Sequence, residues 1–202
     1  MYGHSQQRHQ EMTDMYLQGS RLIGLATGFM MGFLAAFSAP LIVAWLGNQT
    51  EYQIAAIIMT IYTLPQHLHV LTGPGSAFFK GIDNPGNNLI YSFSRLGLTL
   101  VCVIIGLKVF GITIITIATT LAVATTISAL IYLASNNHRI GISQWTFFTK
   151  ATLPGLIPYG IAYSLFGLLT LTPWLTKAME HRWYAVGFIL ISGAIYSLIT
   201  VM

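Results

Sequence analysis

Polar side chains inside otherwise apolar stretches are the residues of this sequence that could do chemistry. The segment 52–79 carries the largest group of them. On a helix, Tyr62, Gln66 and His69 share one face, because residues three and four apart lie side by side. A phenol, an amide and an imidazole can donate and accept hydrogen bonds, and an imidazole can also take up a proton. Two interpretations stay open: these side chains line a wet cavity, or they form hydrogen bonds between helices.

Two basic residues add positive charge near this group. Arg95 lies about two turns inside the apolar segment 89–107, and Lys80 directly follows the segment 52–79. Arg95 can extend its side chain to the membrane surface. Alternatively, it faces a cavity and binds a phosphate, which a planar guanidinium group holds well. In that case Arg95 and Lys80 join the polar face of 52–79 in one substrate cavity.

The positions of the acidic residues and histidines argue against a metal site or a catalytic site. All acidic residues lie in or beside connections between apolar segments: Glu11, Asp14, Glu51, Asp83 and Glu180. These segments alone therefore cannot carry a carboxylate relay for protons or sodium. His67 and His69 are two residues apart and would point in different directions on a helix, with no cysteine or acid beside them. Because P-loop, nucleophile-elbow and zinc-helix motifs are also absent, we expect no enzyme, no cofactor and no metal.

The elements that position these residues follow from the composition. Apolar and aromatic residues make up 54% of the 202-residue chain, and charged residues only 7%, against about 25% in soluble domains. A helix of about 20 apolar residues crosses a bilayer. We therefore expect an all-α, polytopic membrane protein with six transmembrane helices. The predicted spans are 22–46, 52–79, 89–107, 112–134, 151–173 and 183–202.

Residues 1–21 are predicted to be a polar cytoplasmic leader, and residues 22–202 the six-helix lobe. Basic residues favour the cytoplasmic side. With a cytoplasmic amino terminus, six of them fall inside (Arg8, Arg21, Lys80, Arg95, Arg139 and Lys150) and three outside (Lys108, Lys177 and Arg182). Both termini would then be cytoplasmic. The abrupt ends of the chain, and a leader that looks like a connecting loop, predict a fragment or a half-sized version of something larger.

Small residues and prolines carry the remaining information. Gly24, Gly28 and Gly32 recur every four residues, which forms a stripe without side-chain bulk on a helix. This stripe predicts a close helix contact, either ordinary packing or a sliding surface. In the fifth span, Pro154 and Pro158 predict a bend or an irregular start. Pro154 suits a first helical turn, so Pro158 is the better kink candidate.

Three segments carry a family resemblance: YLQGSRL at 16–22, PLIVAWLG at 40–47 and LTGPGSAFFKGIDNP at 71–85, the last followed by Tyr91 and a new apolar span. With them the chain resembles the oligosaccharide flippases of the multidrug/oligosaccharidyl-lipid/polysaccharide exporter superfamily, including the Wzx-type O-antigen flippases. The resemblance covers essentially the whole chain, and its distinctive motifs lie in residues 16–91.

The resemblance implies a fold and a function. Members of the family have two six-helix lobes around a central cavity, and they move polyprenyl-linked sugar units across the bacterial inner membrane by alternating access. This chain would be the carboxyl-terminal lobe. Its partners would be the lipid bilayer, the lipid-linked sugar and a second lobe, either the missing amino-terminal half or a second copy. No basic patch predicts nucleic-acid binding.

Two other functions stay open. The chain could be half of a cation-coupled multidrug exporter, although the lack of carboxylates within its spans weakens this reading. It could also be a non-transporting membrane scaffold subunit, because six helices with short connections permit that role as well.

Overall fold

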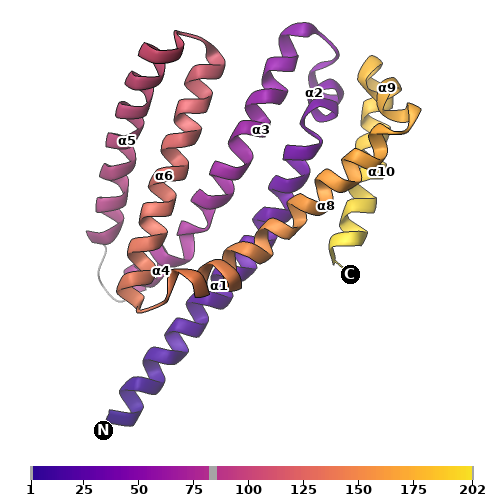
Figure 1. Cartoon of the computed structure of the whole chain (residues 1–202). Helices are drawn as coiled ribbons and strands as arrows, with labels where there is room; N and C mark the ends of the chain where they lie inside the picture. Colours follow the sequence, from indigo (N-terminus) through magenta and orange to yellow (C-terminus); the bar gives the residue numbers. More distant parts are fainter. Residues whose placement is uncertain (1, 82–85, 202) are drawn as a thin grey trace.

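Every element in the computed structural model is a helix within the residues that the structure describes, 2–81 and 86–201 (Figure 1). The predicted all-α class is confirmed. In chain order the elements are α1 (Tyr2–Ala36), α2 (Ser38–Leu46), α3 (Thr50–Val70), α4 (Thr72–Gly81), α5 (Gly86–Phe110), α6 (Ile114–Ile140), α7 (Gln144–Phe147), the π-helical turn η1 (Phe148–Thr152), α8 (Leu153–Thr170), α9 (Pro173–Glu180) and α10 (Arg182–Val201).

Six helical stretches are long and apolar enough to cross a membrane, as predicted. They are Gln10–Ala36, Thr50–Gly81, Tyr91–Phe110, Ile114–Ile140, Gln144–Thr170 and Arg182–Val201. Many large apolar side chains on them stay exposed, among them Leu96, Leu168 and Leu190. Extended apolar surface of this kind is unfavourable in water and is typical of a membrane-facing surface. The chain is therefore a multi-pass membrane protein.

Prolines interrupt the first two spans, which were predicted as single helices. Pro40 has no N–H, and its ring crowds the carbonyl group four residues earlier. That carbonyl belongs to Ala36, the last residue of α1, and the chain leaves the helix at Phe37 before α2 begins. Pro74 stands in the same relation to Val70, the last residue of α3. Each break follows from one missing donor and one steric clash.

The polar segment 1–21 is helical where the structure describes it, from residue 2 onward. The helix α1 begins at Tyr2 and runs without interruption into the first span. The segment contains no proline and is rich in Gln and Met, which favour helix. Residues 2–21 thus continue the helix of the first span, and this part of α1 projects beyond the other helices in Figure 1. Its role as a cytoplasmic leader stays a prediction.

Helices α1 and α8 make the most extensive contact of the lobe, and they cross in the centre of Figure 1. Helix α3 packs between α1 and α6, and α5 packs almost entirely against α6. The end of the bundle where α1 begins and where α4 and α6 end is called the amino-terminal end here. The turn between α5 and α6 lies at the opposite end, and its Gly111 has a φ of +79°, which glycine adopts readily.

The fifth span starts irregularly, before the first of its two prolines. Its helix begins at Gln144 as α7, widens into the π-turn η1 and continues as α8, earlier than the predicted start at residue 151. Pro154 lies in the first turn of α8, directly after η1. Because Pro154 has no N–H to donate, a wider turn before it accommodates the ring. Pro158 lies inside α8 and is buried.

Candidate functional site

A polar cluster joins the second and third spans. His69 lies on α3, and Tyr91 and Arg95 lie one turn apart on α5. The Nδ1 atom of His69 is 2.7 Å from the hydroxyl oxygen of Tyr91, and its Nε2 atom is 3.2 Å from Nη1 of Arg95. Since the backbones of α3 and α5 make little direct contact, these side chains are the main bridge between the two helices.

The chemistry of the donors fixes the direction of both hydrogen bonds. A guanidinium group can only donate, so Nε2 of His69 must accept from Arg95. The imidazole is then neutral, with its proton on Nδ1, and it donates to the hydroxyl oxygen of Tyr91. The positive charge of the cluster therefore stays on Arg95.

Arg95 has no anionic partner in the described part of the chain. Its side chain is partly exposed and turns to the side of α5 that faces the bundle. One guanidinium N–H group binds the imidazole, which leaves further donors for a ligand. A cation at membrane depth is unfavourable without a partner. The site is therefore suited to an anionic group.

Neighbouring helices hold the cluster in place. The ring of Tyr91 packs against the buried ring of Tyr132 on α6, with centroids 4.4 Å apart. The hydroxyl group of Thr72, at the start of α4, donates to the carbonyl oxygen of His69 at 2.7 Å. Residues from α3, α4, α5 and α6 thus set the positions of the imidazole and the phenol, and through them of the guanidinium group.

The structure brings together two of the five residues predicted to line a cavity, His69 and Arg95. Tyr62 and Gln66 are partly exposed on α3, and no hydrogen bond to either is recorded in the described residues. Lys80 is exposed near the end of α4. Tyr91 was not predicted as a site residue, although its position one turn before Arg95 places both side chains on one helix face.

The predicted glycine stripe faces η1 and α8. A Cβ atom at Gly24 would lie 2.9 Å from the carbonyl oxygen of Ala151, and one at Gly28 would overlap the carbonyl oxygen of Gly155. At Gly32 it would lie 3.0 Å from the backbone of Tyr159. The two backbones are therefore in direct contact over three turns. Whether this contact slides during transport stays a prediction.

His67 lies beside this contact, away from His69. Its side chain is fully buried, its ring makes an edge contact with Tyr159, and neither ring nitrogen has a hydrogen-bond partner within the described residues. The part of the chain that the structure describes also holds no group of three His, Cys, Asp or Glu residues that could bind a metal ion.

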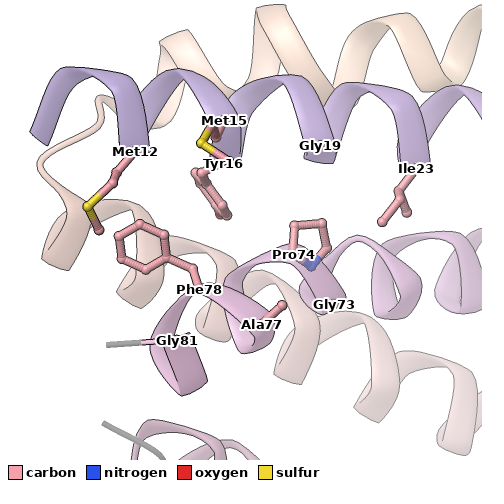
Figure 2. A pocket seen from close by; sticks show the side chains of 10 residues that line it. All are labelled: Met12, Met15, Tyr16, Gly19, Ile23, Gly73, Pro74, Ala77, Phe78 and Gly81. Atoms are coloured by element: carbon pink, nitrogen blue, oxygen red, sulfur yellow. The ribbon is translucent and has the colours of Figure 1, made fainter. Parts of the chain in front are cut away.

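An apolar pocket of about 570 Å³ lies between α1 and α4 at the amino-terminal end. Figure 2 shows Met12 and Ile23 pointing from α1 toward α4. The hydroxyl group of Tyr16 donates to Oδ1 of Asn137 and so serves the core rather than the pocket. The full lining is Met12, Met15, Tyr16, Gly19, Ile23, Gly73, Pro74, Ala77, Phe78 and Gly81. The lining of this pocket is almost entirely apolar, so it has few groups that could form hydrogen bonds with a ligand.

Comparison with protein-family models, with curated proteins and with solved structures finds no match for this chain. Among the described residues, the cluster of His69, Tyr91 and Arg95 is the arrangement with the most specific chemistry.

Proposed function

We propose that this chain is one lobe of a transporter that moves a lipid-linked oligosaccharide, such as an O-antigen repeat unit, across the bacterial inner membrane. The observation that carries the proposal is Arg95, a cation within a membrane-spanning helix that contacts a neutral imidazole and no carboxylate in the described residues. The phosphate groups of a lipid-linked sugar supply the missing negative charge.

The cluster suits a substrate that must bind and then leave. The sugar diphosphate headgroup cannot enter hydrocarbon unaided, whereas the polyprenyl tail can stay in the lipid. His69 accepts a hydrogen bond from the guanidinium group, and Tyr91 holds the imidazole in place from its other side, so the charge of Arg95 stays uncompensated. An internal carboxylate would compete with the phosphate for Arg95, and no such competitor lies beside it in the described helices.

The proposal includes a partner and an orientation. A single lobe supplies one wall of a cavity, so we propose that a second six-helix lobe completes it. The distribution of basic residues supports cytoplasmic termini, with the amino-terminal end of the bundle on the inner side. Arg95 then lies nearer the inner leaflet, from which export would start.

A translocation assay with the full chain in proteoliposomes tests the proposal. The probe is a fluorescent polyprenyl-pyrophosphate sugar, and a membrane-impermeant quencher reports its transfer between leaflets. We expect transfer by the wild-type chain, in which a second copy supplies the second lobe. The rate should be about tenfold lower for Arg95→Gln, because a charge-assisted hydrogen bond is lost. Arg95→Lys should fall between the two, since lysine keeps the charge and loses the planar donor geometry.

A matched control sharpens this test. Lys108 is an exposed cation near the other end of the same helix, so Lys108→Gln should transfer the probe at the wild-type rate. An Arg95→Gln variant that transfers the probe as fast as the wild type would remove Arg95 from the mechanism. A wild-type chain that neither binds nor transfers the probe would overturn the proposed function.

A further inference from the structure

A second pocket, of about 440 Å³, lies on the other side of α1 and contains charges of both signs. Its volume falls in the range of small-ligand sites. Helix α1 and the segment around η1 line it together, with Asp14, Leu17, Gln18 and Arg21 from the first and Thr149, Lys150 and Pro154 from the second. Nothing in the proposed transport mechanism uses these residues.

The charged groups of this pocket do not neutralise one another. Asp14, Arg21 and Lys150 are all exposed, and the structure records no ion pair among them or with the other described residues. Asp14 and Arg21 lie two turns apart on one face of α1, about 10 Å along the axis. The pocket thus has a positive part at Arg21 and Lys150 and a negative part closer to the start of α1.

The two cations lie at one level of the bundle. Gly24, one turn after Arg21, lies against the backbone of Ala151, the residue after Lys150. Long apolar runs without a charged residue begin directly after both cations, with Leu22 on α1 and Ala151 on η1. In a membrane protein this boundary lies at the lipid headgroups, where arginine and lysine meet lipid phosphates.

We propose that this pocket binds the headgroup of a phospholipid with a primary ammonium group, such as phosphatidylethanolamine. Arg21 and Lys150 hold the phosphate, and Asp14 accepts hydrogen bonds from the ammonium group. Gln18 offers an amide donor to the phosphate or ester oxygens. Leu17 and Pro154 add an apolar wall for the glycerol region, so a lipid fits the pocket better than a free phosphate.

The carboxylate selects among phospholipids. A headgroup with a phosphate but no cation leaves Asp14 without a partner and places a second anion near it. A choline headgroup carries a cation but no N–H group to donate to the carboxylate. A primary ammonium group satisfies Asp14 and keeps the phosphate on Arg21 and Lys150. The pocket therefore prefers phosphatidylethanolamine to phosphatidylglycerol and phosphatidylcholine.

Lipid titration of the delipidated full chain, followed by native mass spectrometry, tests the proposal. We expect phosphatidylethanolamine to bind about tenfold more tightly than phosphatidylglycerol or phosphatidylcholine. The double variant Arg21→Gln/Lys150→Gln should lose this binding, and Asp14→Asn should lose the preference over phosphatidylglycerol. Lys177→Gln removes an exposed cation outside the pocket and should bind phosphatidylethanolamine like the wild type.

Other outcomes would overturn the proposal. Equal binding of the three lipids, tighter binding of phosphatidylglycerol, or unchanged binding in a correctly folded double variant would each contradict it. Displacement of the lipid by inorganic phosphate or soluble phosphoethanolamine would show that the headgroup chemistry alone suffices and would reject a lipid site. Because no lipid-linked sugar is present, the result is independent of the role proposed for Arg95.

Discussion

The contact between α1 and α8 and the contact between α3 and α5 are built in opposite ways. At the first, glycines bring two backbones together, and no side chain stands between Gly28 and Gly155. At the second, the backbones stay apart, and His69, Tyr91 and Arg95 span the gap. Close backbone packing resists any displacement, whereas a bridge of two hydrogen bonds can open and close. We therefore expect ordinary packing rather than sliding at the first contact, which we call the fixed contact. We call the second, which holds the candidate substrate site, the adjustable contact.

The largest effect is expected for Gly28→Ala, which breaks the fixed contact. The new methyl group would overlap the carbonyl oxygen of Gly155. We expect the free energy of unfolding to fall by about 1–3 kcal/mol or more, as for other overpacked cores. Thermal unfolding in detergent measures the loss. Gly160→Ala, in open space on α8, is the control and should be neutral or stabilising; equal stability of both variants would reject the close contact.

A smaller loss is expected for Tyr196→Phe. The buried hydroxyl group of Tyr196 on α10 lies 2.9 Å from the carbonyl oxygen of Phe29 and 3.2 Å from that of Pro158, so it joins α10 to both helices of the fixed contact. Removing it should lower the free energy of unfolding by about 1 kcal/mol. Tyr184→Phe, at an exposed position of the same helix, is the control and should unfold like the wild type. If Tyr196→Phe also unfolded like the wild type, the hydroxyl group would contribute nothing to stability.

At the adjustable contact, Arg95→Gln should change a distance more than the stability. The native Cys102 on α5 accepts a spin label, and Leu64→Cys on α3 supplies an exposed second position. We expect a broader or longer distance distribution in Arg95→Gln, because the bond to His69 is lost. Lys108→Gln should reproduce the wild-type distribution. An unchanged distribution in Arg95→Gln would show that packing against α6 alone positions α5.

The smallest effect is expected for His67→Leu, beside the fixed contact. Both ring nitrogens of His67 are buried without a partner in the described residues. An apolar side chain of similar size removes this unfavourable burial, so the melting temperature should stay the same or rise. A clear fall in melting temperature would mean that the imidazole makes a stabilising contact, for example through a buried water molecule.

The helices could be predicted from the sequence because hydrocarbon thickness demands long apolar runs, and six are present. The breaks before Pro40 and Pro74 could not be predicted from the prolines alone, because Pro65 and Pro158 lie inside α3 and α8 without ending them. The short helix α9 in the last connection was not predicted. It is too short and too polar for a membrane span, so length and apolarity carry no signal for it.

The candidate site was predictable only in part. The sequence identifies His69 and Arg95 as candidate site residues, because they are polar residues within apolar segments. Their contact depends on how α3 and α5 are rotated about their axes, which α6 sets by packing against both. Helix periodicity within one segment contains no information on that rotation. Tyr91 was missed for the same reason, because its role appears only when α3 lies beside it.

The most direct test of the account is the affinity of the full chain for a polyprenyl pyrophosphate compared with the uncharged polyprenol, measured by native mass spectrometry. We predict that the wild type binds the pyrophosphate about tenfold more tightly, and that Arg95→Gln abolishes this difference while its binding of the polyprenol is unchanged. A preference for the pyrophosphate that persists in Arg95→Gln would contradict the central claim that Arg95 contacts the anionic group of the substrate.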